Sequence, residues 1–272
     1  MISVHVIINR CVQVSSCVKI IDNVLLLHVY VNKDPVCLIK ISPNMATVLY
    51  YSNTSPPSRT VRMVAGILGL ELELRALTAV ARDQDTPELT KKNPMRSVPL
   101  LEESDYCLAD SHAIIVYLHE KYGKEAHAHL FPSDSRKRAT INQRLHFDCG
   151  ILFPRLRAVL APTFWGKLTE LSKSMKINLE DGYRTLEAYL SKTAYVADDV
   201  LTLADISIYS TVSSMDGIYP VDVKKYPKLK QWLLTMSQKD FCQMYNEPGR
   251  EELVTKITTM MANNKHNQTS KL

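Results

Sequence analysis

The sequence has no long apolar run, no block of like charges and no closely spaced cysteine pair. Its longest apolar stretches are well short of the roughly 18 residues that a membrane-spanning helix needs, so no segment is expected to cross a membrane. The net charge of the 272 residues is only +5, and no basic face is interleaved with aromatic residues, so no nucleic acid is expected as a partner. A hydrophobic fraction of 46% is typical of a globular protein, and the length suffices for two domains.

The six cysteines are scattered, and none forms the C-x-x-C pair of a zinc or redox site. Isolated cysteines are typical of a reducing compartment, so we expect a cytoplasmic protein with inert thiols. Cys107 and Cys149 have apolar neighbours and are expected in the core, a redox role being the less favoured alternative. The histidines at 127 and 129 lie two residues apart on a polar link, a spacing that does not indicate a metal site, and no metal is expected.

Residues 1–44 are apolar and rich in β-forming residues. Polar side chains interrupt them where a secretory signal would be continuous, at Arg10, Lys19, Asp22 and His28. Met45 stands just before the first well-formed strand. We therefore interpret residues 1–44 as an N-terminal extension that is disordered or not part of the functional fold. A targeting role is an alternative with little support.

Residues 45–124 alternate between the hydrophobic periods of strands and helices. The pattern predicts strands over 47–51 and 70–75, and helices beginning after Ser55 and Thr86, the first of them ending at a Gly69 cap. It also predicts strands over 97–101 and 106–108 and a helix over 111–122. This β-α-β-α-β-β-α order predicts a compact α/β domain, a mixed sheet with helices on both faces. Val98-Pro99 stands at the start of a strand, where a cis peptide would make the turn and leave nearby backbone free to bind a ligand.

The rest of the chain is predicted to be all-α. A polar link precedes residues 135–262, which carry apolar seams at helical spacing. Pro154 falls within the seam of residues 145–160 and is expected to kink that helix. Thr202 to Asp205 has the pattern of a capping box. Residues 263–272 are a polar tail that we expect to be disordered.

The segment around Ser55 is the most informative feature of the chain. A short apolar strand runs into Ser55, Pro56 and Pro57 follow, and a helix then begins. The start of a helix presents backbone N–H groups and the positive end of its dipole, so an anion such as a thiolate would bind well there. Taken alone, Ser55 is equally well explained as a helix N-cap, and the same alternative applies to Asp110-Ser111 at the start of the third helix.

These motifs together resemble the cytosolic glutathione transferases. The Leu-Tyr-Tyr strand before Ser55-Pro56-Pro57, the Val-Pro turn and the run Asp-Ser-His-Ala-Ile at 110–114 carry the resemblance. The segments at 145–148 and 152–157 make it closest to the insect epsilon class. The resemblance covers about residues 46 to 250 and implies a thioredoxin-like N-terminal domain, an all-helical C-terminal domain and a homodimer.

The resemblance also implies how glutathione is held. The Ser55 hydroxyl would donate a hydrogen bond to the glutathione sulfur and act as the catalytic residue. Further positions would bind the remainder of the tripeptide: Gln84, Arg96, Val98, Pro99, Asp110, Ser111 and His112. Gln84 and Arg96 depart from the histidines that usually meet the glycyl carboxylate, although an amide and a guanidinium can also bind a carboxylate.

A site for a hydrophobic electrophile would lie between the two domains. The residues expected to line it are Thr54, Pro57, Leu156, Arg157, Leu160, Phe164 and Trp165. For the two leucines, ordinary helix core is an equally good interpretation. Asp148 is expected to serve helix packing or a dimer contact rather than acid–base chemistry.

The sequence therefore predicts a glutathione S-transferase that conjugates glutathione to hydrophobic electrophiles in detoxification. Glutathione would be a co-substrate, and no prosthetic group is expected. The departures at Gln84 and Arg96 leave an alternative, a non-catalytic carrier of hydrophobic ligands on the same fold.

Overall fold

The computed structural model describes residues 14–21, 24–31, 34–41, 47–78 and 83–269. The chain divides into two compact units, residues 1–46 and residues 47–272. Over the described ranges, the model contains no helix that is both long and apolar enough to span a membrane.

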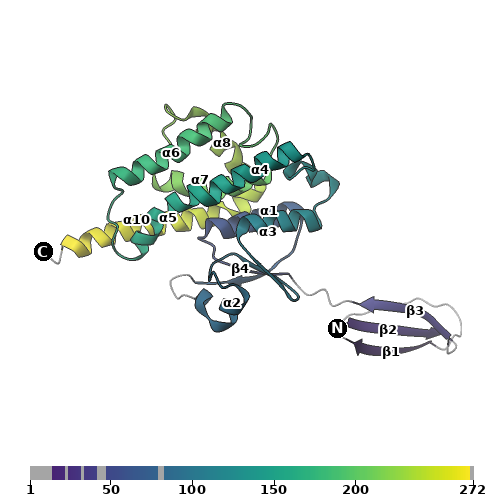
Figure 1. Ribbon diagram of the computed structural model, residues 1–272. Helices are drawn as coiled ribbons and strands as arrows, with labels where there is room; N and C mark the ends of the chain where they lie inside the picture. The colour runs from purple at the N-terminus through teal and green to yellow at the C-terminus, as the bar shows by residue number, and fades with distance from the viewer. Residues whose placement is uncertain (1–13, 22–23, 32–33, 42–46, 79–82, 270–272) are drawn as a thin grey trace. The chain divides into compact units, whose positions relative to one another are not determined.

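The first unit is a three-stranded antiparallel sheet in the order β1-β2-β3 (Figure 1). Its strands are β1 (Val14–Ile21), β2 (Val24–Val31) and β3 (Asp34–Ile41). Each strand is rich in β-branched and other apolar residues, which favour pleated pairing. The expectation of disorder is therefore wrong for these strands. That the unit is not part of the functional fold stays a prediction.

The second unit begins with a four-stranded mixed sheet in the order β5-β4-β6-β7. Its strands are β4 (Val48–Tyr51), β5 (Glu73–Ala76), β6 (Leu100–Glu103) and β7 (Tyr106–Ala109). β5 runs parallel to β4, whereas β6 and β7 are antiparallel to their neighbours. The accompanying helices are α1 (Pro56–Leu68), the 3₁₀ turn η1 (Asp83–Asp85), α2 (Pro87–Lys92) and α3 (Ser111–Tyr122). The β-α-β-α-β-β-α order predicted from the sequence is confirmed.

Side chains alternate across this sheet and separate its two faces. Leu49 and Leu101 join the main core with the buried residues of α1 and α3. Val48, Tyr50 and Leu100 form a smaller cluster with Leu89 of α2. Figure 1 shows the result: α1 and α3 lie between the sheet and the helical domain, and α2 covers the opposite face.

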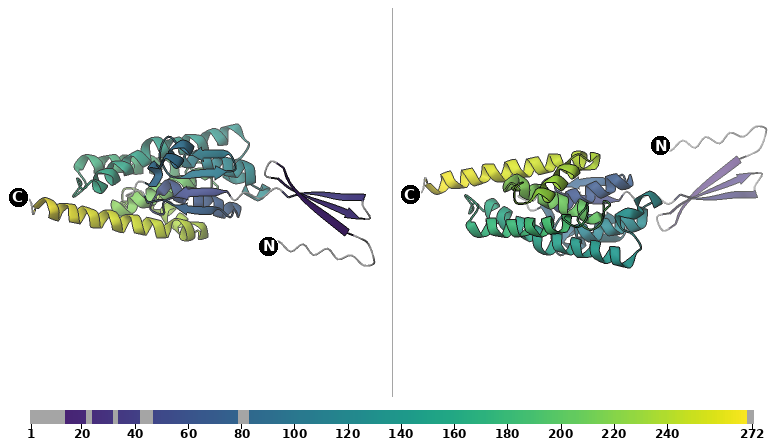
Figure 2. Two further views of the ribbon diagram at one scale, coloured as in Figure 1. Left: turned by 90° about the horizontal axis from the view of Figure 1, so that it is seen from below. Right: turned by 90° about the horizontal axis from the view of Figure 1, so that it is seen from above.

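The helical domain follows a 3₁₀ segment, η2 (Glu125–Leu130). Its elements are α4 (Ser135–Phe147), the π-helical η3 (Asp148–Leu152), α5 (Phe153–Phe164), α6 (Lys173–Leu190), α7 (Leu203–Ile218), α8 (Pro227–Ser237), α9 (Asp240–Tyr245) and α10 (Glu247–Thr269). α7 is buried along most of its length and contacts α1, α4 and α10. Figure 2 shows α10 running along one side of the domain to the C-terminus.

The helical segment around Pro154 contains a π turn. The seam over 145–160 passes through η3, and Pro154 lies directly after it, in the first turn of α5. That Pro154 kinks the helix stays a prediction. A proline ring clashes with the carbonyl four residues earlier in an α-helix, and a wider π turn relieves that clash. The extra residue in the π turn also rotates the seam, and Cys149 is exposed rather than buried.

The expected disordered tail is wrong for residues 263–269, because α10 continues to Thr269. Asn264 is only 8% exposed. Its amide donates hydrogen bonds to the carbonyl oxygens of Thr163 (3.1 Å) and Leu168 (2.9 Å), which anchors this part of α10. Residues 270–272 lie outside the described part of the chain.

Candidate active site at one end of the sheet

The strand register brings the predicted motifs to one end of the sheet. Tyr50 of β4 pairs with Leu100 of β6, and Leu100 pairs with Ala109 of β7. The turn that leads to Ser55 follows β4, Val98-Pro99 immediately precedes β6, and Asp110-Ser111 follows β7. These three segments therefore lie at the same end of the sheet.

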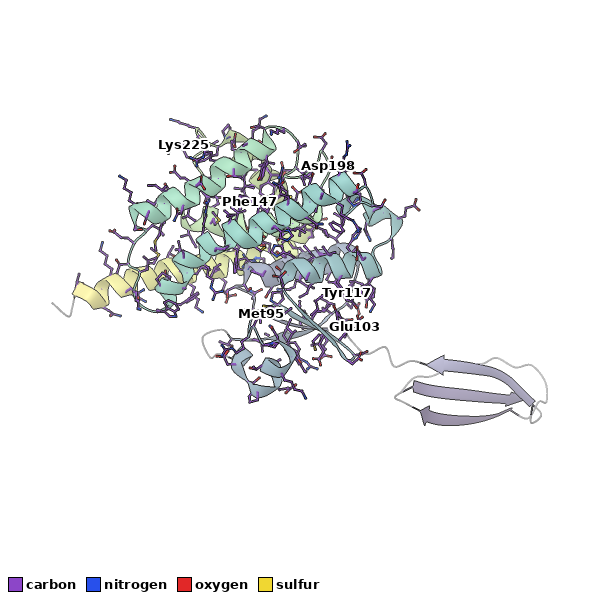
Figure 3. All side chains as sticks on the ribbon, viewed as in Figure 1. Met95, Glu103, Tyr117, Phe147, Asp198 and Lys225 are labelled. Carbon is purple, nitrogen blue, oxygen red and sulfur yellow. The ribbon has the colours of Figure 1, made fainter. Side chains whose placement is uncertain are left out.

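The opposite end of the sheet carries a different set of contacts. There the Glu103 carboxylate accepts hydrogen bonds from the hydroxyls of Tyr117 and Tyr122 and from Lys121. Burial favours the neutral acid, but these hydrogen bonds outweigh it and lower the pKa of Glu103 to about 2. In Figure 3, Glu103 and Tyr117 lie at this end, and Met95, close to the Val-Pro turn in sequence, lies at the other.

Ser55 is the N-cap of α1, as the sequence predicts. Its extended backbone (φ −82°, ψ 115°) lets the side-chain oxygen accept a hydrogen bond from the Ser58 N–H at 3.4 Å. Gly69, in the left-handed conformation at φ 69°, ends the helix as expected. The capping bond uses Ser55 as an acceptor only, so the hydroxyl hydrogen can still donate to a ligand.

The turn before Ser55 is closed by a backbone hydrogen bond and by hydroxyl side chains. The backbone N–H of Ser55 donates to the Ser52 carbonyl at 3.1 Å, and the Ser52 N–H donates to Ser58 Oγ at 3.3 Å. Thr54 Oγ1 lies 3.3 Å from Ser52 Oγ. These contacts define the Ser52–Ser55 turn.

Arg59, in the first turns of α1, is completely buried. Its guanidinium donates to the carbonyl of Thr54 (3.0 Å), to Asn246 Oδ1 (2.9 Å) and to Ser214 Oγ (2.6 Å). Burial, only partly offset by the charge of Glu247, lowers the pKa of Arg59 to about 9, so the side chain remains charged at neutral pH. A buried charge persists only where it is fully hydrogen-bonded, and these partners supply that.

The Val98-Pro99 peptide is cis, as predicted. Asn93, 3% exposed, organises the preceding loop: its side-chain amide donates to the Ser97 carbonyl at 2.8 Å, and its Oδ1 accepts from the Met95 N–H at 3.1 Å. Arg96 is exposed in this loop, with a left-handed backbone at φ 51°.

Gln84 lies in the η1 turn, and its side chain is outside what the structure describes. β5, which precedes η1, leaves the sheet at the same end as β4, because Ala76 pairs in parallel with Tyr51.

Asp110 has the most strained backbone of the predicted set, with φ 77° and ψ 121°. Such conformations cost about 1–3 kcal/mol in non-glycine residues and gather at ligand sites. Its Oδ1 caps α3 by accepting from the N–H groups of His112 (2.9 Å) and Ala113 (3.1 Å). The His112 imidazole, whose Nδ1 lies 3.4 Å from Asp110 Oδ1, is the main cause that lowers the pKa of Asp110, so the carboxylate is ionised at neutral pH. Ser111 beside it is buried.

His112 connects the capped end of α3 to the helical domain. Its Nε2 lies 3.2 Å from Asp148 Oδ2 and 3.0 Å from Ser207 Oγ, and the Ser207 hydroxyl donates to the same carboxylate oxygen at 2.6 Å. Burial opposes the charged imidazole, but its contacts with the carboxylates of Asp110 and Asp148 outweigh it and raise the pKa of His112 to about 9. Asp148, on η3, is buried in this contact, which fits the helix-packing interpretation.

The residues predicted to line the electrophile site differ in exposure. Leu156 (1% exposed) and Leu160 (9%) belong to the main core, in line with the alternative that the sequence left open for them. Arg157 and Phe164 are exposed on the same helix, and Trp165 is 69% exposed at its C-cap. The other two predicted residues, Thr54 and Pro57, flank Ser55 and are partly buried.

Sequence reasoning missed three residues that shape this end of the sheet: Arg59, Asn93 and Ser207. A signal for Arg59 exists, because it precedes the buried Met63 by four residues and so places a charge on the apolar face of α1. Asn93 and Ser207 act through contacts with loops and helices distant in sequence, and their neighbours give no comparable signal.

Comparisons with known proteins agree with this arrangement. Residues 49–126 match the family model of the glutathione S-transferase N-terminal domain, and residues 169–234 match that of the C-terminal domain. Glutathione S-transferase 1 of Manduca sexta is 40% identical over 210 residues, which are 76% of this chain and 95% of that protein.

Two solved structures extend the likeness to three dimensions. An epsilon-class glutathione S-transferase from the housefly, Musca domestica, has a TM-score of 0.76 and 36% identity, covering 79% of this chain and 98% of that one. A glutathione transferase homologue from Drosophila mojavensis with bound glutathione has a TM-score of 0.75 and 36% identity, covering 79% of this chain and 97% of that one. The chain therefore belongs to the glutathione S-transferase family.

Proposed function

We propose that this protein binds reduced glutathione at the end of the sheet next to Ser55 and conjugates it to hydrophobic electrophiles. The observation that carries the proposal is the register of β4, β6 and β7, which gathers the ends next to Ser55, Val98-Pro99 and Asp110-Ser111. A helix start, a free backbone edge and an ionised carboxylate are what a tripeptide with a thiol, an amide backbone and an ammonium group requires.

Each part of glutathione has a matching group. The Val98 backbone, beside cis Pro99, would pair with the cysteinyl residue. The ionised Asp110 would meet the γ-glutamyl ammonium, and Ser111 would meet its carboxylate. Arg96 is exposed and can form a charged hydrogen bond with the glycyl carboxylate, with Gln84 as a second donor. His112 would act behind Asp110, whose carboxylate it contacts.

Ser55 would stabilise the thiolate, which is the reactive form of glutathione. A thiol with a pKa near 8.5 is mostly protonated at neutral pH. Lowering that pKa by about two units requires about 2.7 kcal/mol of preference for the anion. A hydrogen bond to a charged group contributes about 1.5–3 kcal/mol, and the start of α1 adds to it.

The electrophile would lie beside Ser55, against Thr54 and Pro57 and the exposed side chains of Arg157, Phe164 and Trp165. Conjugation, reduction of hydroperoxides and dehydrochlorination all begin from the same thiolate. We further propose a homodimer that acts in the cytoplasm. The free thiols of Cys107, Cys149 and Cys242 support a reducing compartment.

The test combines capture on immobilised glutathione with a conjugation assay using a general aromatic electrophile. We expect capture and turnover by the wild type. Ser55→Ala should reduce turnover about 3- to 25-fold at pH 7, because the loss of one charged hydrogen bond raises a thiol pKa of about 6.5 by about one to two units, while capture persists.

Ser172→Ala is the matched control, because Ser172 is also a serine N-cap, accepting from the Met175 N–H at 3.2 Å, but on α6. Its turnover should equal that of the wild type. Capture without turnover by the wild type would contradict the enzyme and favour the carrier. Full turnover by Ser55→Ala would refute the role of its hydroxyl.

A further inference from the structure

The Ser52–Ser55 turn is held by residues from the far end of the chain. Asn53, within the turn, donates from its side-chain amide to Glu252 on α10 at 2.8 Å. Its Oδ1 accepts from Arg62 on α1 at 3.0 Å. The Asn53 side chain therefore hydrogen-bonds the turn to both α1 and α10.

Arg59 makes the second link between the turn and the helical domain. Its Nη1 donates to the Thr54 carbonyl at 3.0 Å and lies 3.5 Å from that of Asn53. Its other nitrogens donate to Asn246, which separates α9 from α10, and to Ser214 of α7. A planar guanidinium bound on all sides fixes the distances between the groups that it joins.

Gly249, in the first turn of α10, makes the third contact. A Cβ built on it would lie 2.1 Å from the Asn53 carbonyl oxygen and 2.9 Å from Cδ of Arg59. Only a glycine at this position lets the helix backbone approach the turn so closely. Thr54 and Ser55 directly follow Asn53 in the chain, so the backbone that α10 contacts is continuous with that of Ser55.

We propose that the first two turns of α10, through Gly249, Glu252 and the Arg59 contacts, are a positioning element that sets the orientation of the Ser55 hydroxyl. This inference rests on the proposed function, in which that hydroxyl binds the glutathione sulfur. The residues of α10 touch neither glutathione nor the electrophile in this role. They act through the backbone of the Ser52–Ser55 turn.

The first test replaces Gly249 by Ala. The new methyl group must displace the Asn53 carbonyl, although alanine is the better helix former. We expect the apparent pKa of the pH profile of kcat/KM for the electrophile, at saturating glutathione, to rise by about one unit. At about pH 5.5, below the pKa of the bound thiol, kcat/KM should therefore fall about 10-fold, because the thiolate fraction falls by that factor. The KM for the electrophile should remain that of the wild type.

Gly150→Ala is the matched control, because a Cβ at Gly150 meets no atom within 4 Å. It should keep the wild-type pH profile. A merely structural effect of Gly249→Ala would lower thermal stability and leave the apparent pKa unchanged, which would overturn the proposal.

A pair of exposed glutamates supplies a second test that does not threaten folding. Glu252→Ala removes the hydrogen bond to Asn53. Its exposed neighbour Glu251 forms an ion pair with Arg250 at 3.7 Å instead. We expect Glu252→Ala to lower kcat/KM about 3- to 5-fold, in line with the loss of one exposed hydrogen bond, and to raise the apparent pKa, while Glu251→Ala changes neither.

Ser55→Ala in the same assay distinguishes a failure of this inference from a failure of the proposed function. An inactive wild type, or a fully active Ser55→Ala, contradicts the proposed function. An active wild type and an impaired Ser55→Ala, with Gly249→Ala and Glu252→Ala both unchanged, refutes only the role of α10. If Gly249→Ala does not fold, the Glu252 and Glu251 pair decides.

Discussion

The contact between His112 and Asp148 makes a prediction about how stability depends on pH. The pKa of His112 is raised from 6.5 to about 9 in the folded protein, because its contacts with the carboxylates of Asp110 and Asp148 outweigh burial. The folded state therefore binds a proton more tightly than the unfolded state does. The resulting stabilisation is complete below pH 6.5 and is lost as the pH rises to about 9.

The size of this effect follows from the shift itself. A change from 6.5 to about 9 corresponds to about 3 kcal/mol at 1.36 kcal/mol per pKa unit. The side chains of His112 and Asp148 are only 16% and 4% exposed, so solvent screening reduces this little. A domain of this size loses about 2–4 °C in Tm for each kcal/mol.

The assay is urea unfolding at about pH 6 and about pH 10 for the wild type, Asp148→Asn and His129→Gln. Of the unfolding free energy that the wild type and His129→Gln, which alters an exposed histidine, lose between the two values, about 3 kcal/mol should come from His112. Asp148→Asn should lose clearly less, because the pKa of His112 falls towards its ordinary value. An equal loss in all three proteins would refute the assignment of this pH dependence to His112.

Three further predictions concern the framework around the site. Asp205→Ala should lower the unfolding free energy by at least about 3 kcal/mol in urea titration, because the buried carboxylate accepts hydrogen bonds from Val196, Thr202 and Trp232. Gly66→Ala should cost about 1–3 kcal/mol by the same measurement, since the new methyl group would lie 2.2 Å from the Tyr245 ring. A protein that begins at Met45 should match the full chain in Tm and conjugation rate, because residues 47–272 form a compact unit of their own; a clear loss of either would contradict the extension hypothesis.

The features that the sequence predicted correctly depend on neighbours in the chain. Ser55, Thr86 and Asp110 cap their helices, Gly69 ends α1, and Val98-Pro99 is cis, each as its local motif indicates. These motifs lie next to strand ends, and the strand register brings Ser55, Val98-Pro99 and Asp110 to one end of the sheet.

The features that it missed depend on contacts between distant segments. Arg59 donates to Ser214, 155 residues away, and Asn264 to Thr163, 101 residues away. The polar composition of residues 263–269 predicts disorder, but that tertiary contact of Asn264 anchors the helix there. Likewise, an extra residue in the π turn of η3 depends on how α4 and α5 pack around Pro154, which hydrophobic periodicity alone does not reveal.

The central claim is that the Ser55 hydroxyl stabilises the ionised sulfur of bound glutathione. The most direct measurement is the ultraviolet absorbance of the thiolate, followed against pH for glutathione bound to the wild type and to Ser55→Ala. The thiol bound to the wild type should titrate about two units below free glutathione, and the thiol bound to Ser55→Ala should titrate about one to two units higher than in the wild type. Equal pKa values for glutathione bound to the two proteins would contradict the claim.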